Sequence, residues 1–396
     1  MNGKRHPKNK NPIRVFAWAS FLNDLGSDMI YPVWPLFVMS FAGANMAVLG
    51  LIDGLGEAFV SISKAVSGYL ADRFRKRKFF IWSGYLLGSA SRLGYALAPA
   101  WTWLIPFKIL DRTGKIRAAP RDALVADLST DQNRGRHFGL MKAMDNLGAV
   151  CGIVTCLFLF EPLGFMGLFL LAAIPSLVSA FLIYQFIRED KSSDKKLFAP
   201  FTWKQLDSNF RLFLFLNAIF SLGAFSYSFL LIFAGQSGFK PTALPLFYLI
   251  ITVTASIFSL PMGKLSDRLG RKKIMYLAFI LWAGVCVSLM ASTSAVVIIA
   301  VFFLYGLHKA ALETVQKTYT AELCPEDYRS TGLGVFQMAV GVCALPASLI
   351  AGFLWEKLSM RAPFYFSSAL ALAACFLLLF VKETSCGTRR NHRPSS

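Results

Sequence analysis

The stretch GYLADRFRKRK at residues 68–78 returns as GKLSDRLGRKK at residues 263–273, which is 195 residues further along the chain. The same offset relates further positions, pairing Asp127 with Glu322, Arg134 with Arg329 and Gly139 with Gly334. A constant offset from residue 68 to residue 139 indicates a duplicated unit with almost no insertions. Each copy of the basic motif stands between two long apolar runs, so the repeat divides the chain into two halves.

The composition indicates a protein whose solvent is lipid. Of the 396 residues, 55% are hydrophobic and 16% are charged, whereas a typical soluble domain has roughly 25% charged residues. The net charge of +19 does not indicate a nucleic-acid partner, because the basic residues stand at the ends of apolar runs and form no continuous face. The seven cysteines contain no CxxC pair, so neither a zinc site nor a disulfide framework is predicted, and no cofactor is expected.

The apolar runs predict an all-α membrane protein with twelve transmembrane helices in two six-helix repeats, because about 20 apolar residues cross the hydrocarbon core. The predicted helices lie near 14–40, 45–71, 78–99, 101–128, 134–160, 164–187, 209–235, 240–266, 273–292, 294–321, 327–355 and 361–382. The expected organisation is an N-terminal bundle (1–187), a cytoplasmic linker (188–208) and a C-terminal bundle with a short basic tail (209–396). The basic N-terminus leads into an apolar run too long for a signal peptide, which predicts a retained first helix.

Lysine and arginine alternate between loops in the pattern that sets membrane orientation. The N-terminal tail, the linker and the loops at 73–78 and 268–273 are basic, whereas the loops SFAGANM, APAW, EPLG and ASTSA contain no lysine or arginine. Only the turns with Lys240 and with Lys357 and Arg361 are mildly basic exceptions. We therefore expect both termini in the cytoplasm, in a multi-pass protein of the inner membrane that contacts anionic lipid.

The repeated G-x-L-x-D-R motif in a six-plus-six layout resembles the major facilitator superfamily, and the resemblance covers nearly the whole chain. The segment DRTGKIRAAPRDALVAD at 111–127 is similar to helix 4 of a bacterial efflux-like subgroup, which also has segments like SFLNDLGSDMIYPVWPLF and GLIDGLGEA. The resemblance implies a secondary transporter, not an enzyme, that moves a small organic solute by alternating access. It also implies a monomer.

Several positions depart from the family pattern. Arg75 stands where the first motif copy usually has glycine, whereas Gly270 keeps it in the second copy. Lys108 takes the place of an arginine found in many proton-driven exporters, and Arg112 replaces a glycine. The segment GAVCGI at 148–153 lacks the proline of drug/proton antiporters, which weakens an antiport assignment specifically.

The resemblance implies a gating role for the repeated motif. Gly68 and Gly263 would allow close helix approach. Asp72 and Asp267 would accept charge-assisted hydrogen bonds from a neighbouring helix N-terminus or an arginine, forming a latch that holds the outward-open state. The alternative is that these clusters only fix topology, and for the helix 4 residues bracing and gating remain equal alternatives. The full gating set is Gly68, Asp72, Arg73, Arg117, Arg121, Asp122, Gly263, Asp267 and Arg268.

Ionisable side chains at membrane depth are costly, at least about 2.5–3.5 kcal/mol each on insertion scales, and mark functional sites. The predicted substrate and proton pathway lies in the N-terminal half and consists of Asp24, Asp28, Tyr31, Asp53, Glu57, Lys108, Asp111, Arg112, Lys115 and Asp145. Asp24 with Asp28, and Asp53 with Glu57, are i,i+4 pairs that share a helix face. The alternative is a set of ion pairs that only brace the N-terminal bundle.

The C-terminal half offers fewer polar groups at membrane depth, namely His308, Lys309 and Glu313. We interpret His308 as a packing residue. The phenylalanines of helix 7 are expected to face lipid rather than a pocket: Phe213, Phe215, Phe220, Phe225, Phe229 and Phe233. An ionic half against an apolar half suits an amphiphilic solute.

The sequence therefore predicts proton-coupled export of a small organic solute, with import of a metabolite or siderophore-like solute as the alternative. A buried carboxylate that binds a proton would bias the two access states. The sequence contains no GxxxxGK[ST] loop, which disfavours an ATP-driven carrier. Two other classes, an intramembrane hydrolase using Asp28 and Asp53 and a receptor on a carrier fold, stay as minor alternatives. The expected partners are a small-molecule substrate, protons and membrane lipids, and not nucleic acid.

Overall fold

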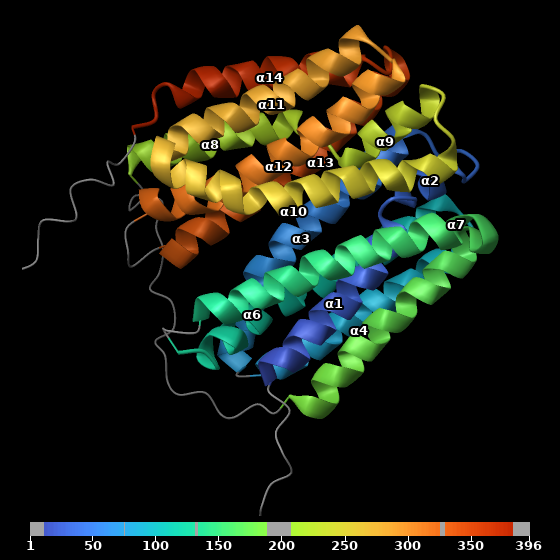
Figure 1. Ribbon diagram of the computed structural model, residues 1–396, viewed down its shortest axis with the longest axis vertical. Helices are drawn as coiled ribbons and strands as arrows, with labels where there is room; N and C mark the ends of the chain where they lie inside the picture. Colours follow the sequence, from blue (N-terminus) through green and yellow to red (C-terminus); the bar gives the residue numbers. More distant parts are fainter. Residues whose placement is uncertain (1–11, 75, 131–133, 188–206, 325–328, 383–396) are drawn as a thin grey trace, which may run out of the picture.

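A computed structural model describes residues 12–74, 76–130, 134–187, 207–324 and 329–382 (Figure 1). These residues are helical and, within those ranges, form no strand, which confirms the predicted all-α class. The N-terminal half contains α1 (Pro12–Ile30), α2 (Trp34–Met39), α3 (Met46–Phe74), α4 (Arg77–Ala96), η1 (Trp101–Trp103), α5 (Leu104–Thr113), η2 (Gly114–Arg117), α6 (Ala118–Asp127) and α7 (Arg134–Phe186). The C-terminal half contains α8 (Ser208–Gly223), α9 (Tyr227–Gln236), η4 (Pro241–Ala243), α10 (Leu244–Leu269), α11 (Arg271–Ala291), α12 (Ala295–Leu323), α13 (Arg329–Lys357) and α14 (Ala362–Leu378).

Seven segments of the described chain are long and apolar enough to cross a membrane. One of them, 136–186, contains two passes, because α7 reverses at Gly164, whose φ of 62° lies outside the helical region (Figure 1). The other predicted passes are interrupted, more polar or short: α1 with α2, α4, α5 with α6, and α14. The described residues thus form the twelve helical passes that the sequence predicts.

Proline and glycine explain the interruptions. Pro32 lies between α1 and α2, and Pro35 stands in the first turn of α2. A proline removes a backbone donor and clashes with the preceding helical turn. The fourth pass changes to a tighter 3-10 turn at Gly114–Arg117, just before Pro120. Consequently the first and fourth passes, which carry most of the predicted site, are irregular where the site lies.

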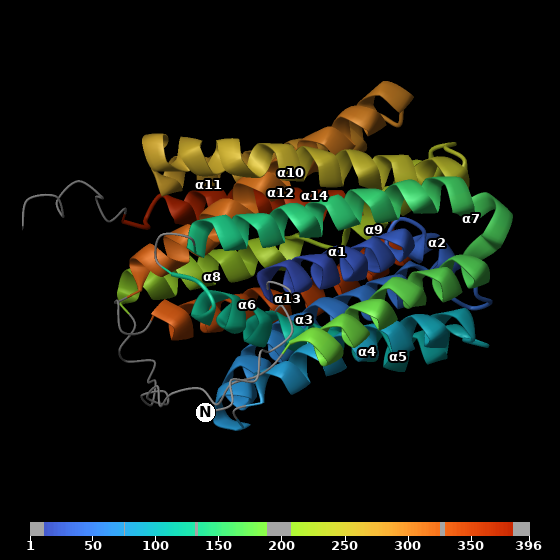
Figure 2. The same cartoon turned by 60° about the horizontal axis from the view of Figure 1, so that its bottom comes forward.

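The two halves lie against each other with their long axes roughly side by side (Figures 1 and 2). We call the end at which α1, α4, α7, α8 and α11 begin the basic end, because it carries Arg14, Arg77, Arg136, Arg211 and Lys272. At the opposite end α2 contacts α9, and α3 packs along α13.

Glycines bring α3 and α13 into close contact toward the opposite end. A methyl group on Gly50 or Gly54 would collide with the backbone of Ser348 or Leu345 on α13. The backbone N–H of Met46 also donates to Glu356 Oε1 at 2.7 Å. Helix backbones approach this closely only where small residues allow it, so the two halves are closed together here.

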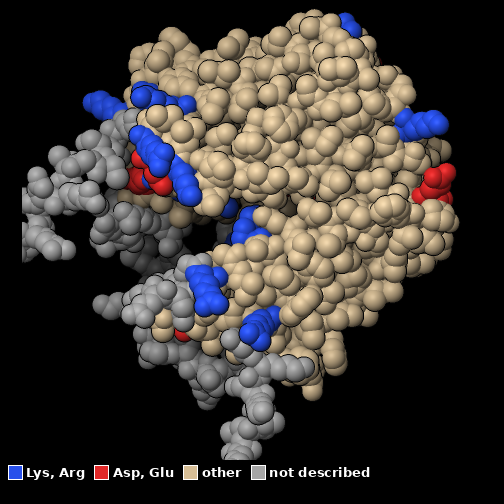
Figure 3. Space-filling model, viewed as in Figure 1, with Lys and Arg blue, Asp and Glu red and all other residues tan. Residues whose placement is uncertain are grey.

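Toward the basic end the two halves separate, and Figure 3 shows the surface hollowed between them. Glu57 on α3 and Glu313 on α12 have side chains that are 54% and 61% exposed. Both residues lie within helices long and apolar enough to cross a membrane. Carboxylates at that depth require water, so the space between the halves is accessible from the basic end.

The prediction that the phenylalanines of the seventh pass face lipid is wrong for all of them but Phe215. Apart from Phe215, which is 58% exposed, the members of this set are buried. Phe220 stacks on Phe279 at 4.3 Å between ring centroids, and Phe229 and Phe233 pack against Trp355. The phenylalanines therefore form the interior of the C-terminal half, since large aromatic rings fill the space between its helices.

Candidate functional site

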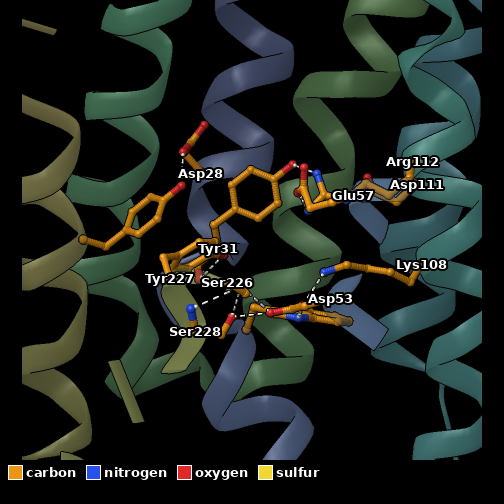
Figure 4. Close-up of polar contacts among 12 residues, drawn as sticks. Asp28, Tyr31, Asp53, Glu57, Lys108, Asp111, Arg112, Ser226, Tyr227 and Ser228 are labelled. Carbon is orange, nitrogen blue, oxygen red and sulfur yellow. Dashed lines mark hydrogen bonds and ion pairs between the residues drawn. The ribbon is translucent and has the colours of Figure 1, made fainter. Parts of the chain in front are cut away.

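The carboxylate of Asp53 lies at the centre of a buried polar cluster that joins the two halves (Figure 4). Its Oδ1 accepts from Trp34 Nε1 at 2.8 Å and from Lys108 Nζ at 3.2 Å. Its Oδ2 accepts from the hydroxyls of Ser226 and Ser228 at 2.7 and 2.5 Å. Trp34 and Lys108 belong to the N-terminal half, whereas both serines stand at the start of α9 in the C-terminal half.

The break between α8 and α9 supplies the two serine donors. Ser226 is the N-cap of α9 and accepts a hydrogen bond from the backbone N–H of Ser228 at 3.3 Å. Serine is favoured at this position because its hydroxyl pairs a backbone donor that the helix leaves open. On the other side of the cluster, the Lys108 ammonium lies 3.7 Å from the centroid of the Trp34 ring. Four donors, one of which is the cation Lys108, thus compensate the burial of Asp53.

Arg112 holds a second cluster next to the first (Figure 4). Its Nη1 donates to the Tyr31 hydroxyl at 3.1 Å, and its Nη2 lies 3.8 Å from Glu57 Oε1. Its Nε lies 3.6 Å from Asp111 Oδ2 and, among the described residues, donates no hydrogen bond. The arginine is therefore shared between three partners from three passes and is not committed to one carboxylate.

Asp28 differs from these carboxylates because it has no cationic partner within ion-pairing distance in the described chain. It is 8% exposed, and its one described side-chain hydrogen bond comes from Tyr248 Oη at 3.4 Å. Asp24, Lys115 and Lys309 are the charged groups around it. Asp28 is the buried carboxylate whose charge is least compensated.

Tyrosines close the space beside Asp28 (Figure 4). The rings of Tyr227 and Tyr248 lie 5.0 Å apart between centroids, and Tyr31 lies 6.5 Å from Tyr248. The Tyr227 hydroxyl donates to the backbone oxygen of Tyr31 at 3.2 Å. Aromatic rings of this kind offer an apolar body and a polar tip, so the site can contact an amphiphilic solute.

Nearer the basic end, Asp145 of the predicted pathway forms a separate group with Arg121 and Asp122 of the predicted gating set. Arg121 Nη1 donates to Ser20 Oγ at 2.6 Å, lies 3.8 Å from Asp145 Oδ1, and its Nε donates to Asp122 at 3.0 Å. Ser20 also contacts Asp145. These contacts link α1, α6 and α7, which favours a bracing role.

Three further predicted residues stand apart from both clusters. Asp24 accepts from Asn23 Nδ2 at 2.9 Å. Arg117 is buried and donates to the backbone oxygen of Gly114 at 2.8 Å. Lys115 is half-buried and forms no ion pair with a described residue.

The contacts of the repeated motif can be given only for its second copy. In the first copy the helical backbone at Gly68, Asp72 and Arg73 is described, but the side chains are not. In the second copy Arg271 Nη1 donates to Asp267 at 2.5 Å and Nε donates to Glu322 at 3.0 Å. A methyl group on Gly263 would lie 3.3 Å from Thr314 Cγ2, and Arg268 is exposed. The observed contacts of Asp267 and Gly263 thus connect α10, α11 and α12 within one half, not the two halves.

The polar centre of the C-terminal half is smaller. His308 is buried, and its Nδ1 lies 2.8 Å from the backbone oxygen of Ala278, as expected for a packing residue. Lys309 Nζ and Glu313 Oε1 lie 3.8 Å apart, and both side chains are exposed toward the space between the halves. In the part of the chain that the structure describes, no group of three or more acidic, histidine or cysteine side chains could hold a metal ion.

Sequence reasoning missed Arg92, a buried charge of the N-terminal half that is as enclosed as Lys108. Arg92 on α4 is 2% exposed, and it donates to Ala172 O at 2.7 Å, to Ser176 Oγ at 2.5 Å and to Ser27 Oγ at 2.8 Å. It therefore fixes α1 against α4 and the second pass of α7. An arginine in the interior of an apolar run was the signal that could have identified it. Ser226, Ser228, Tyr227 and Tyr248 carried no comparable signal, because their role depends on contacts between the halves.

Comparison with known proteins gives a consistent result. The family model of the Major Facilitator Superfamily matches this chain over residues 16–258 and 213–395. An uncharacterized MFS-type transporter of Methanocaldococcus jannaschii is 36% identical over 382 residues, which cover 93% of this chain and 94% of that protein. The quinolone resistance protein NorA of Staphylococcus aureus is 24% identical over 389 residues, which cover 94% of this chain and 96% of that protein.

Solved structures share the arrangement of helices at low sequence identity. The nucleoside transporter NupG superimposes with a TM-score of 0.80 at 12% identity, over 94% of this chain and 100% of that chain. A D-xylose-proton symporter superimposes with a TM-score of 0.75 at 16% identity, over 95% of this chain and 98% of that chain. At these identities the likeness concerns the fold alone.

Proposed function

The chain belongs to the major facilitator superfamily, and from this premise we propose that it moves a small organic solute across the membrane by proton-coupled alternating access. It is a multi-pass membrane transporter and not an enzyme. We further propose that it works as a monomer, with residues 1–187 and 209–396 as the two moving bundles and 188–208 as their linker.

The observation that carries proton coupling is the position of Asp28. The Asp53 and Arg112 clusters neutralise their carboxylates with cations and hydrogen bonds, whereas among the described residues Asp28 has one side-chain partner, the Tyr248 hydroxyl at 3.4 Å. A buried charge without a partner is strongly disfavoured, so a proton on Asp28 removes the largest uncompensated charge. Lys115 and Lys309 are close enough to act on Asp28, and their approach or withdrawal during the access change would release or bind the proton.

The clusters also suggest how the access states interconvert. Asp53 with Ser226 and Ser228, and the glycine contacts between α3 and α13, close the opposite end, while the basic end is open. Opening the opposite end requires these contacts to break and a new set to form at the basic end. Binding of a proton or a solute near Arg112 and Asp28 would shift this balance by its different affinity for the two states.

We propose that the basic end faces the cytoplasm, with both termini inside, because lysine and arginine accumulate on cytoplasmic loops. A structure open at the basic end then presents its site to the cytoplasm, which suits loading for export. Import of a metabolite remains the alternative, since a carrier passes through both access states in either direction.

Cysteine labelling tests this orientation. Asn45 is exposed at the opposite end, and Lys273 is exposed at the basic end. We expect an impermeant maleimide added to intact cells to label a cysteine at position 45 and to label one at position 273 only after the membrane is permeabilised. The unmodified chain, with its own cysteines, is the background. The reverse pattern would contradict the orientation.

Flux measurements in proteoliposomes test the function itself. Purified protein should accumulate at least one member of a panel of nucleosides, sugars, organic acids and amphiphilic amines when a pH gradient is imposed, and a proton ionophore should abolish the accumulation. Accumulation in the alkaline lumen indicates symport, and accumulation in the acidic lumen indicates antiport. Transport that ignores the pH gradient and the ionophore would contradict proton coupling, and no transport across the panel would favour a receptor.

A further inference from the structure

A second site lies in the N-terminal half and shares no lining residue with the Asp53 and Arg112 clusters. At the basic end the starts of α1 and α7 enclose a pocket of about 690 Å³. It is lined by Ile13, Arg14, Arg136, His137, Gly139, Leu140 and Ala143. The volume falls within the range of small-molecule sites, about 300–1,000 Å³. The transport mechanism proposed above uses none of these residues.

The pocket has a cationic rim. Arg14 and Arg136 come from different helices and both are exposed. Neither side chain forms a hydrogen bond or ion pair within the described chain. The first turn of α7, which begins at Arg134, adds the positive end of a helix dipole. His137 is half-buried, and its Nδ1 lies 2.7 Å from Ser129 Oγ, which holds the ring at the pocket wall. The pocket is therefore complementary to an anion.

Its other wall is apolar and continues into the membrane. Leu140 is 39% exposed, and Leu147, two turns further along α7, is 52% exposed. On α1, Trp18 follows Arg14 by one turn and is 55% exposed. Tryptophan gathers at the level of the lipid headgroups, which places the arginines at the phosphate level and the leucines beside the acyl chains.

The internal repeat shows that the fold does not need these arginines. The residues 195 positions after Arg14 and Arg136 are Asn209 and Thr331. Asn209 is used for packing, because its Nδ2 donates to Lys382 O at 2.8 Å and its Oδ1 accepts from Lys382 N at 2.9 Å. The two arginines are thus a feature of one half only.

We propose that this pocket binds the phosphate headgroup of an anionic phospholipid, with Arg14 and Arg136 as its ligands and the α1–α7 surface beside its acyl chains. Arginine recognises phosphate through a planar set of donors, and anionic lipid is what a basic surface at this level of the membrane meets. The N-terminal tail is an unsuitable occupant, because Lys4, Arg5, Lys8 and Lys10 give it the same charge as the pocket rim.

Two kinds of variant separate a pocket from general attraction to the basic end. The double variant Arg14→Gln/Arg136→Gln removes the ligands, and Lys264→Gln/Lys273→Gln removes the same charge from exposed positions of the C-terminal half. Gly139→Leu fills the pocket without changing charge, since a side chain there meets no atom within 4 Å. Gly334→Leu is its matched control, at the repeat-related position with the same open surroundings.

The full-length protein in neutral detergent is titrated with fluorescent phosphatidylglycerol, and with phosphatidylcholine carrying the same label. We expect tighter binding of phosphatidylglycerol, a loss of about tenfold in Arg14→Gln/Arg136→Gln and in Gly139→Leu, and less than about twofold change in the two controls. Elution volume and melting temperature confirm that each variant is folded. Equal losses in the controls, or equal binding of the two lipids, would overturn the proposal. Displacement of the lipid by inorganic phosphate at constant ionic strength would assign the pocket to a free anion instead.

Discussion

Replacing Asp28 with asparagine is expected to reduce pH-driven flux about tenfold or more while leaving solute exchange without a gradient largely intact. Asparagine resembles the protonated carboxyl in shape and charge, so the variant can bind solute but cannot cycle between protonated and charged forms. The geometry supports the choice of Asp28, because it is the buried carboxylate without an ion-pair partner among the described residues. The measurement compares flux under a pH gradient with counterflow exchange in the same proteoliposomes.

Two further variants test whether the expected effect is specific to Asp28. Asp24→Asn, one turn away on the same helix face, should retain most pH-driven flux, because Asp24 stands apart from both clusters. Glu57→Gln should weaken flux and exchange together if Glu57 holds Arg112 for the solute. Equal loss of flux and exchange in Asp28→Asn would assign Asp28 to solute binding. Full retention of both would remove it from the mechanism and direct attention to Asp111 and Asp145.

The pair Lys108 and Asp53 should show the largest effect on stability. Replacing Lys108 with methionine leaves the Asp53 carboxylate buried without its cation, and breaking a buried pair in this way costs about 3–5 kcal/mol. We expect the melting temperature in detergent to fall by about 5 °C, because the entropy of unfolding scales with the length of the chain. The double variant Lys108→Met/Asp53→Asn removes both charges. The asparagine oxygen can still accept from Trp34, and its NH2 group can donate to the serine hydroxyls, which are able to accept as well as donate. Most of the lost stability should therefore return.

Measuring transport in the same variants distinguishes a loss of stability from a loss of the conformational change. The double variant should be stable yet transport poorly, because Asp53 also joins the two halves through Ser226 and Ser228. Arg77→Gln, which removes an ion pair with the half-exposed Asp127, is a suitable control and should change the melting temperature little. An additive loss of stability in the double variant would contradict the pairing, and normal transport would contradict the role of Asp53 in the access change.

The helical architecture could be predicted from sequence because a segment that crosses lipid must be apolar and must pair its own backbone hydrogen-bonding groups. Apolar length fixes the passes, and the repeated motif fixes their pairing. The predicted helix near 101–128 is in fact divided into α5, η2 and α6, since Gly114 and Pro120 alter the local backbone. The phenylalanines of the seventh pass were misjudged because an apolar side chain is equally suited to lipid and to a helical interior.

The site was predicted in part, for a physical reason. Charged residues at membrane depth can be recognised from sequence because they stand within apolar runs. The structure brings Tyr31, Glu57, Asp111 and Arg112 into one cluster. Which carboxylate lacks a partner depends on distances between helices, and the hydroxyl donors of Asp53 come from the other half of the chain. Neither follows from residue types alone, because serine and tyrosine are common in apolar helices without any polar role.

The fourth pass has a consequence for how this protein is made. The segment from Leu104 to Asp127 contains Lys108, Asp111, Arg112, Lys115, Arg117, Arg121, Asp122 and Asp127. Eight charged side chains make its transfer into lipid alone costly, and it is absent from the segments of the described chain that are long and apolar enough to cross a membrane. Its carboxylate partners Asp53 and Glu57 stand on α3, which leaves the ribosome earlier. The nascent fourth pass is therefore expected to wait at the translocon until it can enter beside α3, with Lys108 paired to Asp53 and Arg112 to Glu57.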